Sequence, residues 1–214
     1  STPVTSLAPP LYAFIALPFS FLGVRGLIFL NTLAFLITAM LVFLYAQKIS
    51  HHRLTPWISC ATFVLGGYSI EYAQGFWPHM LSVSLVMTAV FLLRSSDDEG
   101  FPFRILLSGF VVGVATGVRQ QNIIFAGCLG LLLLITSKRR VYHSIAFASG
   151  LLLPLAAISF IHLTVLNQFH PFPKFSAYAQ AIASQPQGES IFLRALRAFW
   201  TKVVDFSTFS PPTD

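Results

Sequence analysis

Charge is the property that this sequence most lacks. Only 9% of its 214 residues are charged, whereas 55% are hydrophobic, and the mean hydropathy is +0.74. A soluble domain carries about 25% charged residues, so this composition excludes an ordinary water-soluble protein. We therefore predict an integral membrane protein that crosses the bilayer several times.

Cysteine is also scarce, with only two residues in the chain. Cys60 and Cys128 both fall inside apolar runs, where a thiol behaves as a small hydrophobic group. The sequence therefore predicts neither a disulfide framework nor a cysteine metal site. The net charge of +6 comes from basic residues at the ends of apolar runs. There they indicate membrane orientation and phospholipid contact, and we expect no nucleic-acid partner.

Apolar runs of nearly spanning length predict an all-α, polytopic bundle of about six transmembrane helices. These runs cover residues 26–47, 56–72, 79–95, 104–118, 121–137 and 142–166. The segment 9–23 is apolar but short and holds three prolines. We expect it to lie in the membrane interface or to re-enter, because proline disrupts the interior of a helix.

We expect a single transmembrane domain over residues 1–214, as a piece of a longer protein. Residues 1–25 would form the end of a first external loop, and residues 26–166 the six-span core. Residues 167–214 would form a further external loop. That loop contains IFLRALRAFWTKVVDF, whose apolar residues recur at helical spacing. This pattern predicts an interfacial amphipathic helix on the outer face, with an ordinary packed helix as the alternative.

Basic residues in the short loops predict the orientation, because Lys and Arg are retained on the cytoplasmic side. They gather at residues 48–53, around the acidic loop 95–100, and at residues 138–140. The stretch EYAQGFWPHM, residues 71–80, then faces outward. We expect a multi-pass protein of the bacterial cytoplasmic membrane, with this stretch on its periplasmic face.

Gly109, Gly113 and Gly117 recur at every fourth residue. Residues spaced in this way share one face of a helix, and small side chains there let a neighbouring backbone approach closely. The three glycines predict tight helix packing and carry no chemistry.

Glu71 and His79 flank the outward turn and are the first candidate functional pair. Ionisable residues at a membrane edge are costly, so each is a functional candidate. The two side chains are predicted to hold a divalent metal ion, or the imidazole in its protonated form to bind a phosphate oxygen. In the alternative interpretation Glu71 is solvated, and Tyr72, Phe76 and Trp77 form an aromatic belt at the interface.

Further candidates lie in the other outward segments. Arg119 sits between two apolar runs, and its guanidinium suits a lipid phosphate; a snorkelling side chain is the alternative. After the last run, Lys174 and Tyr178 supply a cation and a hydroxyl that could help close a polar substrate site, unless this segment is only an exit loop. His162, inside the last run, is expected to be a core histidine.

Three segments carry a resemblance to a known enzyme class. They are the proline-containing LAPPLYAFIALPFSFLG, the span-turn-span YSIEYAQGFWPHMLSVSLVMTAVFLL, and the glycine-rich SGFVVGVATGVRQQNIIFAGCLGLLLLI that contains Arg119. In order and pattern the chain resembles the polytopic GT-C glycosyltransferases, specifically the bacterial relatives of the dolichyl-phosphate-mannose protein mannosyltransferases (glycosyltransferase family 39). The resemblance extends through most of the chain.

The resemblance implies transfer of a sugar from a polyprenyl-phosphate donor to an acceptor glycan, lipid or protein on the outer face. It also implies an essential aspartate early in the first external loop, which would lie upstream of Ser1, so this fragment alone would be inactive. Many relatives carry a carboxylate in the second outer turn, where this chain has Pro78 and His79. A transporter or flippase, or a non-catalytic membrane subunit, remains the alternative.

Overall fold

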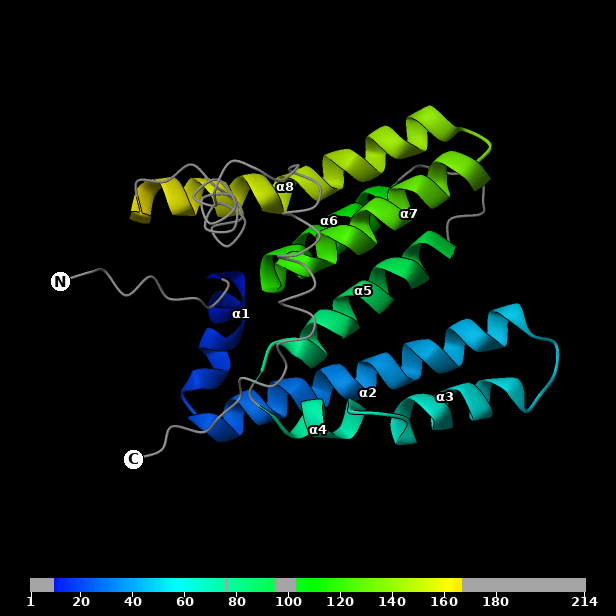
Figure 1. The fold of residues 1–214 in the computed structure, drawn as a ribbon, viewed down its shortest axis with the longest axis horizontal. Helices are drawn as coiled ribbons and strands as arrows, with labels where there is room; N and C mark the ends of the chain where they lie inside the picture. The colour runs from blue at the N-terminus through cyan, green and yellow to red at the C-terminus, as the bar shows by residue number, and fades with distance from the viewer. Residues whose placement is uncertain (1–9, 76, 95–102, 167–214) are drawn as a thin grey trace, which may run out of the picture. The chain divides into compact units, whose positions relative to one another are not determined.

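The computed structural model describes residues 10–75, 77–94 and 103–166, which belong to one unit that ends at residue 171. Within these ranges every regular element is a helix, which confirms the all-α prediction. The elements are α1 (Pro10–Ser20), α2 (Val24–Ile49), α3 (Thr55–Leu65), α4 (Ser69–Gln74), α5 (His79–Arg94), α6 (Phe103–Val118), the 3-10 turn η1 (Gln120–Asn122), α7 (Ile123–Thr136) and α8 (Arg140–Leu166) (Figure 1).

Five of the six predicted apolar runs become helices within a few residues of the expected bounds. The run 56–72 was expected as one helix, and this prediction was wrong. The helix ends at Leu65, because Gly66 and Gly67 interrupt it and Gly67 takes a positive φ of 69°. Glycine adopts that conformation without steric cost. The short α4 then begins at Ser69 and carries the chain into the outer turn.

Within the described residues, two helices are long and apolar enough to span a membrane, namely α2 and the Arg140–Ile161 part of α8. The other apolar helices are shorter. Helices α5 and α6 have 16 residues each. At 1.5 Å per residue they measure about 24 Å, less than the ~30 Å hydrocarbon core of a bilayer.

Contacts between helices run in the order α3, α2, α5, α6, α8 and α7, so neighbours in space are not always neighbours in sequence (Figure 1). One apolar core joins α5, α6, α7 and α8 around Val112 and Phe147. A second joins α1, α2, α5 and the end of α6 around Met80 and Val118. The predicted interfacial segment 9–23 contributes α1, which packs on α2 and α6.

The most extensive contact between two of the described helices is that between α6 and α8. A methyl group placed on Gly109 would collide with the carbonyl oxygen of Phe147, and one on Gly113 would lie 2.7 Å from that of Leu151. From the other helix, a methyl group on Gly150 would collide with the backbone of α6. The predicted role of the glycine repeat in close packing is therefore confirmed.

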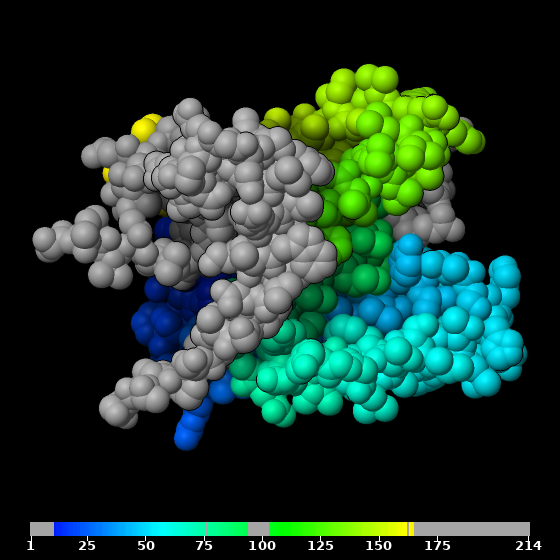
Figure 2. Space-filling model, in the orientation of Figure 1, coloured from blue at the N-terminus to red at the C-terminus, as the bar shows by residue number. Residues whose placement is uncertain are grey.

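Large apolar side chains cover much of the outward surface of these helices, and Figure 2 shows α2 and α3 lying together on one face. On α2 the exposed apolar residues include Phe29, Leu33, Leu36, Ile37 and Met40. On α7 they are Ile124, Phe125, Leu131, Leu132, Leu134 and Ile135. Apolar surface of this extent is typical of contact with lipid or with another protein.

Candidate functional site

The turn that carries EYAQGFWPHM is fixed to α2 by a buried asparagine. Asn31 is 0% exposed, and its side-chain Nδ2 donates hydrogen bonds to the carbonyl oxygens of Gly75 (2.8 Å) and Trp77 (3.0 Å). Next to it, the hydroxyl of Thr32 donates to the carbonyl oxygen of Ala73. These bonds satisfy backbone groups of an irregular segment that would otherwise be buried without partners.

Replacing Asn31 with leucine should destabilise this turn. The substitution leaves the carbonyl oxygens of Gly75 and Trp77 without their donor, which we expect to cost about 1–3 kcal/mol. Gln47→Leu is the matched control, because Gln47 is exposed on the same helix. A lower melting temperature for Asn31→Leu than for Gln47→Leu is expected, and equal melting temperatures would contradict the anchoring role.

A second buried asparagine fixes the neighbouring outward turn. Asn122, in η1 between α6 and α7, donates from Nδ2 to the Ser82 hydroxyl on α5 and to the Ala115 carbonyl on α6, both at 2.7 Å. Ser82 is itself buried. The start of α5 is thus tied to the end of α6, which brings His79 close to Arg119.

His79 lies against two aromatic rings. Its imidazole stacks on the Tyr72 ring with 4.8 Å between centroids, and the Trp77 ring meets it nearly edge-on at 6.5 Å. The Nδ1 atom of His79 is buried and has no hydrogen-bond partner in the described part of the chain. A buried nitrogen without a partner is uncommon and calls for an explanation such as a missing ligand.

Arg119 completes this group, which we call the outer cluster: Tyr72, Trp77, His79 and Arg119. Arg119 interacts electrostatically with both His79 and Tyr72. Burial lowers the pKa of the Arg119 guanidinium, and the interaction with Tyr72 raises it in part. A guanidinium remains protonated in proteins at neutral pH, so the cluster carries a half-buried positive charge.

The other predicted members of the site are not all brought together. Glu71 is exposed on α4, whereas His79 packs on the rings of Tyr72 and Trp77. Among the described residues, no three His, Cys, Asp or Glu side chains gather as metal ligands would. The Glu71–His79 metal site therefore stays a prediction, and it finds no support in this arrangement.

Several predictions fall outside the described residues. They concern Lys174, Tyr178, the amphipathic stretch within residues 167–214, the ring of Phe76 and the side chain of His162.

Three residues beside the outer cluster were not predicted from the sequence, namely Asn31, Asn122 and Tyr12. Burial raises the pKa of the Tyr12 phenol, and a hydrogen bond with Asn31 lowers it in part, which places α1 beside the anchored turn. Asn31 and Asn122 could have been found from the sequence, because each is an asparagine within or at the edge of an apolar run. Tyr12 carries no comparable signal, because tyrosine is common at membrane interfaces.

Comparison of the chain with protein-family models, curated proteins and solved structures finds no match.

Proposed function

We propose that this chain forms part of a membrane glycosyltransferase that moves a sugar from a polyprenyl-phosphate donor to an acceptor on the outer face of the bilayer. The outer cluster would receive the phosphate of the lipid carrier. The proposal combines the resemblance in sequence with the geometry of this cluster, and it treats the helices as membrane-spanning.

One observation carries the proposal most directly. The Arg119 guanidinium is half-buried, yet no carboxylate pairs with it in the described part of the chain, and the ionisable groups with which it interacts are His79 and Tyr72. Leaving a buried charge uncompensated is costly. A phosphate that accepts hydrogen bonds from the guanidinium and from His79 would remove this cost.

The chemistry requires such a group. In the proposed transfer, the bond between sugar C1 and the phosphate oxygen breaks, and a bond from an acceptor oxygen to C1 forms. Negative charge accumulates on the departing phosphate, where a fixed cation stabilises the transition state. The acceptor proton passes to a base, which the resemblance implies is an aspartate.

The helix layout supports a multi-pass arrangement with about six spans. Helices α5, α6 and α7 each correspond to one predicted span, and α3 and α4 together cover the remaining run. Their outward surfaces are apolar, as lipid contact requires. The basic loops at residues 48–53 and 138–140 lie at the ends opposite the outer cluster (Figure 1), consistent with a cytoplasmic position.

The test uses the full-length protein in lipid vesicles, supplied with a polyprenyl-phosphate hexose and candidate acceptors. We expect a glycosylated acceptor and free polyprenyl phosphate in equal amounts. Movement of the lipid or of a solute across the vesicle membrane, with no transfer product, would replace this proposal with the transporter or flippase alternative. If the vesicles show no transfer product and no movement, the chain is better explained as a non-catalytic subunit.

A further inference from the structure

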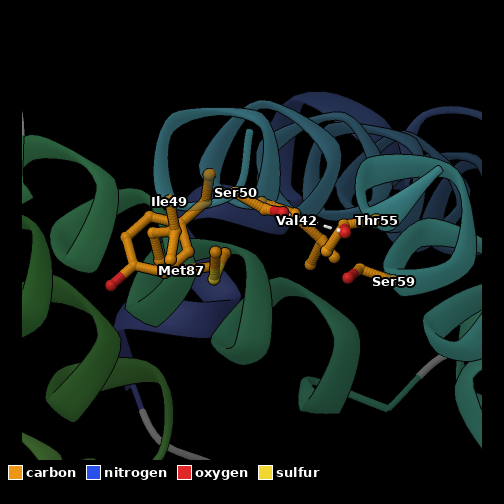
Figure 3. A pocket seen from close by; sticks show the side chains of 8 residues that line it. Val42, Ile49, Ser50, Thr55, Ser59 and Met87 are labelled. Atoms are coloured by element: carbon orange, nitrogen blue, oxygen red, sulfur yellow. Dashed lines mark hydrogen bonds between the residues drawn. The ribbon is translucent and has the colours of Figure 1, made fainter. Parts of the chain in front are cut away.

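A second site lies at the other end of α2, where this helix turns into α3. Residues from α2, α3, α5 and the turn between α2 and α3 line an open pocket of about 250 Å³. Its lining consists of Val42, Tyr45, Ala46, Ile49, Ser50, Thr55, Ser59 and Met87. Thr55 and Ser59 lie on one side of the pocket, and Ile49 and Met87 on the other (Figure 3). Tyr45 follows Asn31 by fourteen positions, or about 21 Å of helix, so this pocket is separate from the outer cluster.

The pocket is mostly apolar and too small for a whole lipid or cofactor. Pockets that enclose small molecules usually measure about 300–1,000 Å³. A segment of one hydrocarbon chain suits both its volume and its lining. The surface around the pocket also suits contact with lipid. Its apolar residues Ile49, Leu54, Trp57 and Ile58 are all more than half exposed. Tryptophan in particular is enriched where a membrane meets water.

Basic residues are concentrated beside the pocket. Lys48, His51, His52 and Arg53 occupy or adjoin the turn between α2 and α3, and the chain holds no acidic residue between positions 24 and 65. The ammonium group of Lys48 lies 4.6 Å from the centre of the Phe91 ring, which holds it beside α5. The imbalance of charge on the turn between α2 and α3 favours an anionic ligand over a neutral one.

The turn itself has a defined conformation. The Ser50 hydroxyl donates to that of Thr55 at 2.9 Å and accepts the backbone N–H of His52 at 3.2 Å. The Nδ1 atom of His52 accepts the backbone N–H of Leu54 at 3.3 Å, so in the neutral ring the proton lies on Nε2. His52 and Arg53 are both exposed on this turn, so the His52 Nε2–H and the Arg53 guanidinium can donate to a ligand there.

We propose that this pocket binds an anionic phospholipid of the cytoplasmic leaflet. One acyl chain enters between α2, α3 and α5, and Arg53 and His52 contact the phosphate. An apolar cavity beneath a cationic turn matches the two halves of such a lipid. The proposal goes beyond the transferase function and does not depend on it.

The experiment measures lipid binding to the full-length protein in detergent by native mass spectrometry. Phosphatidylglycerol and phosphatidylcholine with the same acyl chains are compared, and glycerol phosphate serves as a competitor. We expect one tightly bound phosphatidylglycerol per chain at this site, with weaker binding of phosphatidylcholine. Equal affinity for the two lipids, or displacement by glycerol phosphate as effective as by phosphatidylglycerol, would overturn the proposal.

Two variants and two matched controls locate the site. Ala46→Phe fills the pocket and should weaken phosphatidylglycerol binding about tenfold, while Ala61→Phe, at an exposed position on α3, should not. Arg53→Gln should weaken binding about fivefold, while Arg139→Gln, exposed in another basic loop, should not. Should Ala46→Phe fail to fold, Ser59→Leu fills the same space. Unchanged binding in the folded filling variant and in Arg53→Gln would place the lipid elsewhere.

Discussion

Replacing Gly109 with leucine should strongly destabilise the protein. The new side chain would meet the carbonyl oxygen of Phe147 on α8, which is backbone and cannot rotate away. Overpacking a well-packed core usually costs about 1–3 kcal/mol, and forcing two helices apart should reach or exceed the upper value. We expect a large loss of monodisperse protein and a lowered melting temperature in detergent.

Gly127→Leu is the matched control for this substitution. Gly127 also lies inside a helix, α7, but a methyl group there would meet nothing within 4 Å. Leucine also has a higher helix propensity than glycine, so the control should melt at or slightly above the wild-type temperature. Equal destabilisation by the two substitutions would show that glycine matters for the backbone of each helix and not for the contact between α6 and α8.

Arg119→Gln should have the largest effect on activity. The proposed transfer loses the cation that stabilises the departing phosphate, while glutamine keeps part of the volume and some hydrogen-bonding capacity. Removing one such donor from a transition-state site typically lowers kcat by about 100-fold to 1,000-fold. We expect a loss of kcat/KM of about 100-fold for the polyprenyl-phosphate donor, measured on purified full-length protein.

Arg139→Gln controls for the change in net charge, because Arg139 is exposed in a loop away from the outer cluster. Its transfer activity should match the wild type. The two variants should also have similar melting temperatures, so that a loss of activity in Arg119→Gln is not a loss of folded protein. Full activity in a well-folded Arg119→Gln protein would remove this residue from the site.

Some parts of the fold could be predicted from the sequence because the signal is local. Apolar runs bounded by polar residues predict α2, α5, α6 and α8 closely, and the spacing of Gly109 and Gly113 predicts a close helix contact. The break between α3 and α4 was missed because its flanking residues are as apolar as the rest of the run. The conformation of Gly67 decides the break, and glycine alone in a sequence does not reveal its φ angle.

The partners of each helix could not be predicted, because they depend on contacts between residues far apart in the chain. The same limit applies to the candidate site. His79 and Arg119 were each singled out, but the bonds of Asn122 to Ser82 and Ala115 and the packing of Met80 on Val118, which bring their turns together, join residues far apart in the chain. The expected pairing of His79 with Glu71 followed from their positions on either side of one turn, and it stays a prediction; the stacking of His79 on Tyr72 was not expected.

The central claim is that the outer cluster receives the phosphate of a polyprenyl carrier, and photo-crosslinking tests it most directly. The full-length protein in lipid vesicles is irradiated with a polyprenyl phosphate that carries a photoreactive group near its phosphate, and the modified peptides are identified by mass spectrometry. The account predicts adducts on peptides containing residues 72–79 or Arg119, which excess unlabelled polyprenyl phosphate suppresses. Adducts confined to the pocket and turn at residues 42–59, or unaffected by the competitor, would contradict it.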